Sequence, residues 1–399
     1  MTGPEIRGWC PGALRPMLSG DGWVVRVRPP CGRLAPAQAA GVAQLAIRHG
    51  NGWLDLSSRA NLQIRGVSAP GHAPLIQGLR DLGLVDDDAA HEGRRNIMVT
   101  PFWRVGDGVQ TVVLGLTAAL AAPGAPDLPG KFGFAVDTGI CPVLQHSPAD
   151  IRIEAVPAGL IVRADGFATG AQAEPTTAAG LAMELAQWFL ATGGAVAGRG
   201  RMARHLAHLS VPERHDRLPP HFRTPVVRQT QATGQSTGQA GDATVGAHAA
   251  GFMVAIAFGQ MRAETLTLLA GMGSLRLTPW RMILVEGLQD APTLPGLITD
   301  PCDPMLRVIA CTGRPGCLQA HQPTRDLARA LAPKVPKGMT LHVSGCAKGC
   351  AHPAPADITL VAAPDGFGLI RNGVASDQPA IRNLSVAAIA DSLKAAHAP

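Results

Sequence analysis

The sequence predicts an α+β protein built by internal duplication, and two repeats lead to this fold class. An alternating strand, a helix and a strand-turn-strand follow one another within residues 21–66, and a similar succession returns within residues 251–287. A second pattern, Ala-Asp-Ile followed by Pro and two Gly, occupies residues 149–166 and recurs at constant offset in residues 356–373. Repeats of this kind indicate that the chain runs through two related halves.

The first repeat predicts its elements in a simple order. Residues 21–28 alternate like a half-buried strand, residues 36–49 carry helix-compatible Ala, Gln and Leu, and residues 53–66 read as strand, polar turn and strand. A short helix is expected over residues 74–84, with Pro74 in its first turn, where proline is tolerated. Helices would thus cover one face of an antiparallel sheet.

The second copy and the helix before it follow the same logic. We expect a strand over 251–259, a helix over 263–272 and a strand-turn-strand over 277–287. Thr176 or Thr177 is a suitable cap for a helix that runs to residue 192 with its apolar stripe in the core. Taken together, the two repeats give the domain order A, B, A′, B′.

Composition limits the possible function. With 46% hydrophobic and 16% charged residues over 399 positions, the chain is not intrinsically disordered. Its net charge of +6 favours an anionic ligand but is too diffuse for nucleic acid. Uncharged apolar stretches stay shorter than the roughly 20 residues of a membrane span, and the first five residues lack an apolar export region. We therefore expect a cytoplasmic protein without a membrane or nucleic-acid partner.

Four of the eight cysteines form two pairs, Cys311-x5-Cys317 and Cys346-x3-Cys350. Four thiolates can hold a structural zinc or a cubane iron-sulfur cluster. The long Gly/Pro loop between the first two thiols favours the larger cluster over zinc. Zinc and four unrelated buried cysteines remain alternatives, since free cysteine is commonly a small buried hydrophobe.

This cysteine pattern resembles the cluster motif of the sirohaem-dependent sulfite and nitrite reductases, whose chains show the same twofold repetition. Within that superfamily, segments 137–142, 310–317 and 342–353 are most similar to those of the precorrin-3B synthases. The resemblance implies a pseudo-twofold duplicated nitrite/sulfite reductase-like fold. Its expected parts are a first ferredoxin-like half domain (10–85), a cluster-type domain without a cluster (86–215), a flexible linker (216–247), a second ferredoxin-like half domain (248–297) and a [4Fe-4S] domain (298–399).

The resemblance also implies an activity and its cofactors. Family members are O2-dependent monooxygenases of aerobic cobalamin biosynthesis, which hydroxylate precorrin-3A at C20 and form a γ-lactone from the ring A acetate. A [4Fe-4S] cluster would be held by Cys311, Cys317, Cys346 and Cys350, a mononuclear non-haem iron is possible, and NADH is the ultimate reductant. Because no G-x-G-x-x-G follows a strand, NADH is expected to act through a separate reductase or ferredoxin.

Four cations are carried over as contacts to tetrapyrrole carboxylates. Arg59 matches the Arg of a Thr-Arg-Gln-x-x-Gln turn, and Arg65 lies just beyond that turn. Arg95 matches an Arg-Asn stretch, and Lys131 matches the first Lys of an Arg-Lys-Phe-Lys segment. A guanidinium suits carboxylates because it binds them bidentately. Solvated arginines are the plainer interpretation of Arg59 and Arg65.

Two departures from the reductase pattern argue against an inorganic substrate. Gly130 and Gly133 stand where a sulfite reductase has an Arg and a second Lys around its small anion.

The two copies also differ in the turn that carries Arg59. The second copy has Trp280 and Arg281 where the first has Arg59 and Ala60. We therefore expect one active site per chain.

Ligands for a mononuclear iron are not singled out by any close spacing. The candidates are His and carboxylate residues, as in two-His, one-carboxylate sites, and they are His352, His146, Asp150, His342 and Asp357. His352 comes first because it follows the cluster loop. Cys141 lies near the position of the second cysteine pair in a copy that lacks the other thiols, so it is a vestige or a ligand to another group.

Two further functions stay open. The first is a sirohaem-dependent assimilatory sulfite or nitrite reductase, in which Cys350 would bridge the haem iron. The second is an electron carrier or a zinc-stabilised binding protein, which the size of the chain disfavours.

Overall fold

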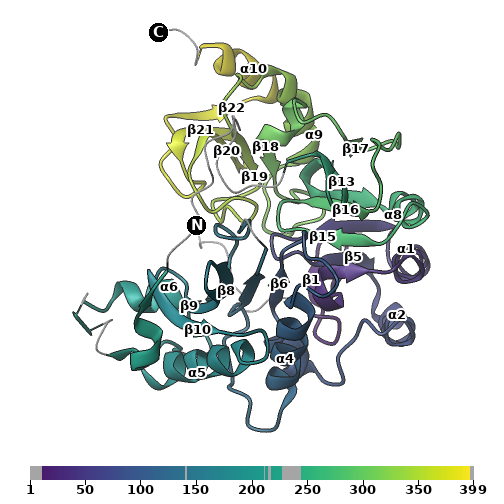
Figure 1. Ribbon diagram of the computed structural model, residues 1–399. Helices are drawn as coiled ribbons and strands as arrows, with labels where there is room; N and C mark the ends of the chain where they lie inside the picture. The colour runs from purple at the N-terminus through teal and green to yellow at the C-terminus, as the bar shows by residue number, and fades with distance from the viewer. Residues whose placement is uncertain (1–10, 140–141, 211, 214–216, 227–243, 396–399) are drawn as a thin grey trace.

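The computed structural model describes residues 11–139, 142–210, 212–213, 217–226 and 244–395, and these form four β-sheets with helices packed against them. The two smaller sheets lie side by side, with one larger domain below them and the other above (Figure 1). Within the described residues, no helix has the length and hydropathy needed to cross a bilayer.

The first small sheet is antiparallel, in the order β1-β2-β5-β4-β14. Its strands are β1 (Met17–Ser19), β2 (Gly22–Val27), β5 (Leu62–Val67), β4 (Trp53–Leu56) and β14 (Gln260–Arg262). Helices α1 (Pro36–His49) and α2 (Ala69–Asp81) share one hydrophobic core with the apolar residues of β2, β4 and β5. The expected first α+β unit is confirmed.

The second small sheet repeats this plan in the order β12-β13-β16-β15-β3, with β17 also paired to β13. Its elements are β12 (Gly246–His248), β13 (Gly251–Ile256), β16 (Met282–Glu286), β15 (Leu275–Leu277), β3 (Arg33–Leu34), β17 (Leu297–Ile298) and helix α8 (Ala263–Ala270). Each sheet takes its outermost strand from the other copy, because β3 pairs with β15 and β14 pairs with β4. The two copies therefore share a core and are not separate domains.

The first larger domain carries a six-stranded sheet in the order β11-β10-β9-β8-β7-β6. Its elements are α3 (Ala89–Arg94), β6 (Ile97–Val99), α4 (Val109–Ala121), β7 (Phe134–Asp137), β8 (Ile151–Val156), β9 (Gly159–Ala164), β10 (Thr169–Ala173), α5 (Ala178–Ala191), α6 (Met202–Ala207) and β11 (Thr224–Pro225). Strands β6, β7 and β8 are parallel, and β9 and β10 continue the sheet antiparallel.

The second larger domain repeats this arrangement in the order β18-β19-β20-β21-β22, again with three parallel strands followed by antiparallel ones. Its elements are β18 (Val308–Ala310), α9 (Arg325–Leu331), β19 (Leu341–Ser344), β20 (Ala356–Ala363), β21 (Gly366–Gly373), β22 (Ile381–Leu384) and α10 (Val386–Ala395). The expected repeat of residues 149–166 in residues 356–373 is thus two equivalent hairpins, β8-β9 and β20-β21.

Unusual backbone conformations recur at matching positions of the two copies. A 3-10 turn follows the long strand of each small sheet, and its middle residue has a left-handed conformation, Cys31 at φ 53° and Phe258 at φ 58°. The hairpin turns match as well, with Ala60 at φ 53° and Arg281 at φ 63°. Residues other than glycine seldom adopt this conformation, so its recurrence at matching places supports the pseudo-twofold relation.

The predicted start of the second helix is wrong. Helix α2 begins at Ala69, where Ser68 caps it by accepting a hydrogen bond from the backbone N–H of Gly71 at 3.2 Å. Pro70 occupies the first turn, and Pro74 lies inside the helix. The sequence offers two prolines near the start, and the serine before Pro70 decides between them because it can satisfy a free backbone donor.

The predicted linker is wrong at both ends. Residues Pro220–Arg223 form a 3-10 turn with Phe222 buried, and β11 then pairs with β10. At the other end Val245 is buried and β12 begins at Gly246. These apolar residues anchor the ends of an otherwise polar segment, whose residues 227–243 lie outside the described part.

Arginines of the small sheets connect them to the larger domains, and each is paired with a carboxylate of its own sheet. In the first copy Arg65 pairs with Asp55 at 3.0 Å, and in the second copy the charges are reversed, with Glu286 pairing to Arg276 at 2.6 Å. Arg65 also donates to the carbonyl of Gly316 at 3.1 Å. Arg276 donates to the carbonyl of Pro101 at 2.7 Å. In each copy the small sheet is thus hydrogen-bonded to a loop of the larger domain in the other copy. That loop follows the first strand of the larger domain.

Candidate functional site

The four paired cysteines lie in two loops at one edge of the last sheet. Cys311 follows β18, and Cys346 and Cys350 follow β19. These strands are parallel and in register, with Ala310 opposite Val343, so their carboxyl ends bring both loops to the same edge. The backbone N–H of Gly345 donates to the Cys311 sulfur at 3.1 Å.

The four thiols lie near enough to interact electrostatically, while within the described residues no three of them gather closely enough to share a single metal ion. Burial is the main reason that the pKa of the Cys350 thiol is raised, and the neighbouring thiols of Cys346, Cys311 and Cys317 raise it further. The pKa of Cys346 is likewise raised, first by burial and then by Cys311 and Cys317. Like charges act on one another in this way only at short range, because solvent screens longer ones.

The donor set fits a [4Fe-4S] cluster. Four soft thiolates on two turns are the ligands that such clusters require. A Cβ on Gly345 would come within 2.7 Å of the Ala320 Cβ and 3.3 Å of the Cys311 sulfur, so only glycine leaves the loops this close. The cluster assignment itself stays a proposal.

Two of the four predicted tetrapyrrole contacts lie together. The Arg59 guanidinium donates to the backbone carbonyl of Lys131 at 2.9 Å, and the Lys131 side chain is exposed. Gly133 lies directly under this pair, because a Cβ there would be 3.1 Å from Arg59 Nη1 and 3.1 Å from the Asn96 carbonyl. A side chain at this position, such as the lysine of the sulfite reductase pattern, would require Arg59 or the Asn96 backbone to move by a few tenths of an ångström.

Arg65 has a structural role. It is 4% exposed, and each of its guanidinium nitrogens is engaged, with Asp21 at 2.6 Å, Asp55 at 3.0 Å and the Gly316 carbonyl at 3.1 Å. This geometry leaves no free fork for a substrate carboxylate, in contrast to the expectation from the sequence. Arg65 instead holds the loop that carries Cys317.

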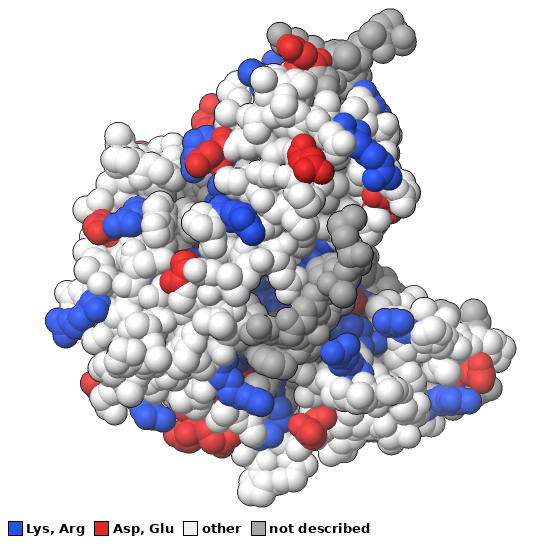
Figure 2. Space-filling view, turned by 180° about the vertical axis from the view of Figure 1, so that it is seen from behind, with Lys and Arg blue, Asp and Glu red and all other residues white. Residues whose placement is uncertain are grey.

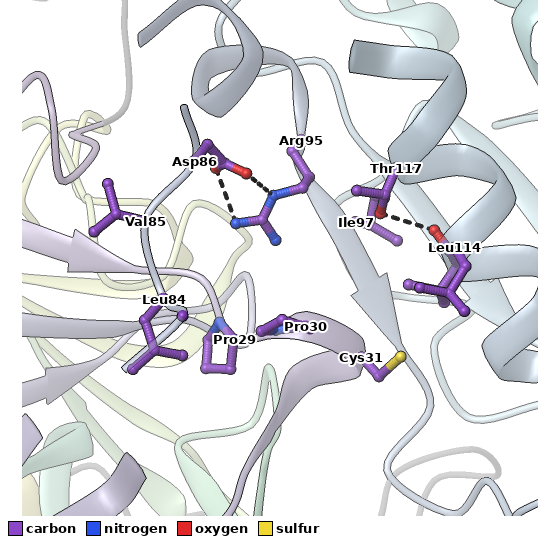
Figure 3. A pocket seen from close by; sticks show the side chains of 12 residues that line it. Pro29, Pro30, Cys31, Leu84, Val85, Asp86, Arg95, Ile97, Leu114 and Thr117 are labelled. Carbon is purple, nitrogen blue, oxygen red and sulfur yellow. Dashed lines mark hydrogen bonds and ion pairs between the residues drawn. The ribbon is translucent and has the colours of Figure 1, made fainter. Parts of the chain in front are cut away.

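Arg95 lines a separate cavity of about 190 Å³ (Figure 3). Its guanidinium is held by Asp86, with Nε–Oδ1 at 2.7 Å and Nη2–Oδ2 at 2.9 Å. The walls are mostly apolar and include Leu84, Ile97 and Cys31. The carboxylate of Asp86 therefore engages the Arg95 guanidinium in this cavity.

The duplication explains this cavity. Cys31 stands where the second copy has Phe258, and the Phe258 ring is buried in the core of the last domain. The smaller thiol leaves space unfilled between the 3-10 turn and α4. Cys31 borders the cavity and has the same left-handed backbone conformation as Phe258. A larger side chain therefore fits at position 31.

We expect Cys31→Phe to raise the free energy of unfolding by about 1 kcal/mol, as cavity-filling substitutions commonly do. Both Cys31 and Phe258 have a left-handed backbone, so the substitution adds no new strain. Urea titration of the anaerobic protein would measure it, with the exposed Cys302→Phe as the control. A destabilised Cys31→Phe protein would show that the two positions are not equivalent.

The mononuclear iron candidates are not assembled into one site. Among the described residues, no three His, Cys, Asp or Glu side chains gather closely enough to share a metal ion. Asp150 is fully buried and bound to Arg201 at 2.8 Å, and Asp357 accepts from the backbone of Thr340 at 2.7 Å. His146 is exposed. Cys141 lies outside the described residues.

Only His342 and His352 meet, with ring centroids 5.7 Å apart. His342 is fully buried on β19, and neither of its ring nitrogens has a hydrogen-bond partner among the described residues. Burial, His352 and Arg281 lower the pKa of His342 to about 4, so its ring is neutral at pH 7.

Sequence reasoning missed Arg26. This arginine is 6% exposed, and its Nε and Nη1 atoms have no partner within the described chain. It is paired in register with Gln63, which is in turn opposite Asp55, so a polar row crosses the first small sheet. The sequence did contain a signal for Arg26, because it is a charged residue within the apolar strand β2.

Asp137 was noted in the sequence only as part of the segment 137–142 and was assigned no role of its own. It ends β7 and is 1% exposed, and its Oδ2 accepts from the backbone of Leu144 at 2.6 Å. Burial raises the pKa of its carboxyl from 3.8 to about 7. The folded chain therefore holds this proton to higher pH than the unfolded chain does.

We expect Asp137→Asn to remove a pH dependence of stability. In the parent protein the free energy of unfolding should fall as pH rises from about 4 to about 7, by up to ~1.4 kcal/mol per pH unit, and then level off. The asparagine stays neutral, so the variant should be the more stable protein at pH 8 and similar at pH 4. Urea titrations across this range test it, with exposed Asp127→Asn as the control. Equal slopes for parent and variant would contradict it.

Cations gather beside a hollow near the middle of one face. Figure 2 shows Lys and Arg atoms in and around this hollow. A surface of this kind attracts a ligand with several carboxylates.

Comparisons with known proteins agree with this architecture. Residues 15–82 match the family described as the nitrite/sulfite reductase ferredoxin-like half domain. The NirA protein of Mycobacterium tuberculosis has a similar fold, with a TM-score of 0.67 at 16% identity over 92% of this chain and 79% of that one.

Two curated relatives extend over nearly the whole chain. Ferredoxin–nitrite reductase of Synechococcus elongatus is 24% identical over 88% of this chain and 78% of its own. Precorrin-3B synthase of a Sinorhizobium species is 31% identical over 94% of this chain and 84% of its own. The α+β fold is thus that of the nitrite/sulfite reductases, and the chain belongs to the precorrin-3B synthase family of that superfamily.

Proposed function

We propose that this oxidoreductase converts precorrin-3A to precorrin-3B by O2-dependent hydroxylation at C20, with a γ-lactone formed from the ring A acetate. The observation that carries the proposal is the 31% identity to a precorrin-3B synthase over 94% of the chain. One oxygen atom of O2 enters the product, and the other leaves as water with two electrons that come ultimately from NADH. A separate reductase or ferredoxin delivers these electrons, as the name of the ferredoxin–nitrite reductase relative suggests.

Cys311, Cys317, Cys346 and Cys350 hold the [4Fe-4S] cluster in this proposal. Bound there, the cluster supplies one-electron transfer at the edge of the last sheet. The protein's part is to keep the thiols together, through the glycine at 345 and through the hydrogen bond from Arg65 to the loop at Gly316. Backbone donors such as the Gly345 N–H stabilise thiolate charge.

Arg59 and Lys131 anchor substrate carboxylates in this proposal. They come from different domains and lie next to one another at Gly133. Arg26 adds a buried guanidinium with unpaired nitrogens, which a carboxylate would satisfy. These cations position the macrocycle. The binding energy of its peripheral carboxylates thereby orients the carbon that reacts.

The alternative, reduction of sulfite or nitrite on sirohaem, is disfavoured by the space around Gly133. Glycine supplies no cation at that position, and a lysine there would require Arg59 or the Asn96 carbonyl to move. The cation density that would hold a small oxyanion is therefore lower than in the reductase pattern.

Isotope labelling tests the reaction. Anaerobically purified protein is incubated with precorrin-3A, NADH, a ferredoxin reductase system and 18O2, and the product is analysed by mass spectrometry. One labelled oxygen in the product is expected. A product without label refutes oxygenation, and an intense Soret band in the purified protein would favour the sirohaem alternative.

We expect Arg59→Gln to raise the KM for precorrin-3A about tenfold, the effect of losing one charge-assisted contact of roughly 1.4 kcal/mol. kcat should change little, because the contact is to the periphery of the substrate. Steady-state kinetics would measure both constants. Arg104→Gln, an exposed arginine, is the matched control. An unchanged KM would remove Arg59 from the substrate site.

A further inference from the structure

A guanidinium from the second small sheet reaches the cysteine loops. Arg281 lies in the turn between β15 and β16, and its Nη2 donates to the carbonyl of Ala351 at 2.9 Å. That carbonyl directly follows Cys350 in the chain. The residue keeps a left-handed backbone at φ 63°, where the first copy has the small Ala60.

The charge of Arg281 acts on the thiols. Burial and the neighbouring Arg325 lower its pKa to about 10, while Asp55 and the Cys311 thiol raise it. The group is therefore cationic at neutral pH and lies close enough to Cys311 to interact with it. Arg325 lies 3.4 Å from the Asp55 carboxylate, which also pairs with Arg65.

A neutral hydrogen-bond donor lies next to this cation. His342 is fully buried beneath Gly349, since a Cβ on that glycine would be 3.9 Å from the ring. Its two ring nitrogens are unpaired within the described residues, although a buried polar group without a partner is destabilising. A sulfur-rich group bordered by the cysteine loops would accept its N–H.

We propose that Arg281, with His342 beside it, sets the reduction potential of the cluster by stabilising its reduced state. On reduction the cluster takes one electron from the external donor and gains one negative charge, with no proton transferred. A fixed buried cation favours that added charge. The inference rests on the cluster of the proposed function and not on the hydroxylation.

Redox titration tests the inference without any measurement of activity. The parent and its variants are loaded with iron and sulfide anaerobically and titrated with dithionite and mediators, and the reduced cluster is followed by electron paramagnetic resonance. We expect Arg281→Gln to lower the ratio of reduced to oxidised cluster at fixed potential at least tenfold, which is about 59 mV for one electron. Arg281→Lys keeps the charge and should stay within threefold of the parent.

Two further variants complete the design. His342→Leu should shift the ratio in the same direction by a smaller factor, and it decides the matter if Arg281→Gln does not fold. Arg329→Gln removes an exposed arginine whose guanidinium lies over the Phe258 ring, and its midpoint should match the parent. Unmoved midpoints in Arg281→Gln and His342→Leu overturn this inference alone. A parent protein that takes up no iron and sulfide overturns the cluster assignment and the inference together.

Discussion

Cys346→Ser should remove the iron-sulfur cluster and with it the conversion of precorrin-3A. Neighbouring thiols help to raise the pKa of Cys346 and of Cys350, so the four lie near one another, and loss of one leaves an incomplete ligand set. We expect the variant to contain less than about a tenth of the parent's iron and acid-labile sulfide, with activity lost in proportion. Both are measured on anaerobically purified protein.

Cys302→Ser is the matched control for this experiment. Cys302 is an exposed free cysteine on a loop, and its thiol is not among those that act on Cys346 or Cys350. The control should keep full iron, sulfide and activity. A Cys346→Ser protein that retains a complete cluster would show that the four thiols are not its ligands.

Arg65→Leu should lower the free energy of unfolding by about 3–5 kcal/mol, the cost of leaving buried charges without their partner. Arg65 is 4% exposed and Asp55 is 6% exposed, so Asp55 would lose its closest counter-ion in a poorly solvated place, and Asp21 would lose its partner. The Gly316 carbonyl would lose its donor as well. Urea titration measures the change.

Arg217→Leu provides the comparison, because Arg217 forms an exposed pair with Glu213 at 3.2 Å. Exposed pairs contribute about 0–1 kcal/mol. If both substitutions had similarly small effects, the Arg65 network would not be a structural tie. We also expect Arg65→Leu to weaken cluster retention, because the loop with Cys317 depends on it.

The repeats and the cysteine spacing could be predicted from the sequence because both are local patterns. Alternation gives the strands, and constant offsets give the copies, as with the hairpins β8-β9 and β20-β21. The exchange of β3 and β14 could not be predicted, because these strands have two and three residues and pair across most of the chain. Patterns within a segment do not record a partner so distant.

Roles of individual arginines were harder to predict than their positions. Arg59 and Arg65 are six residues apart and look alike in sequence, yet one adjoins Lys131 and the other is enclosed by Asp21 and Asp55. The acidic partners that decide this come from other strands. Arg95 is similar, since Asp86 occupies its guanidinium. Resemblance to a motif predicts the position of an arginine, but it does not predict whether that arginine binds a carboxylate of the protein or one of a ligand.

The reciprocal pairing of β3 and β14 has the geometry of an arm-swapped homodimer whose two subunits have been joined into one polypeptide. A symmetric ancestor of that kind would carry two equal centres. Fusion places both under one gene, so that the two can then change independently. The reversed charges at Arg65–Asp55 and Arg276–Glu286 are what such separate drift leaves at two once-identical contacts.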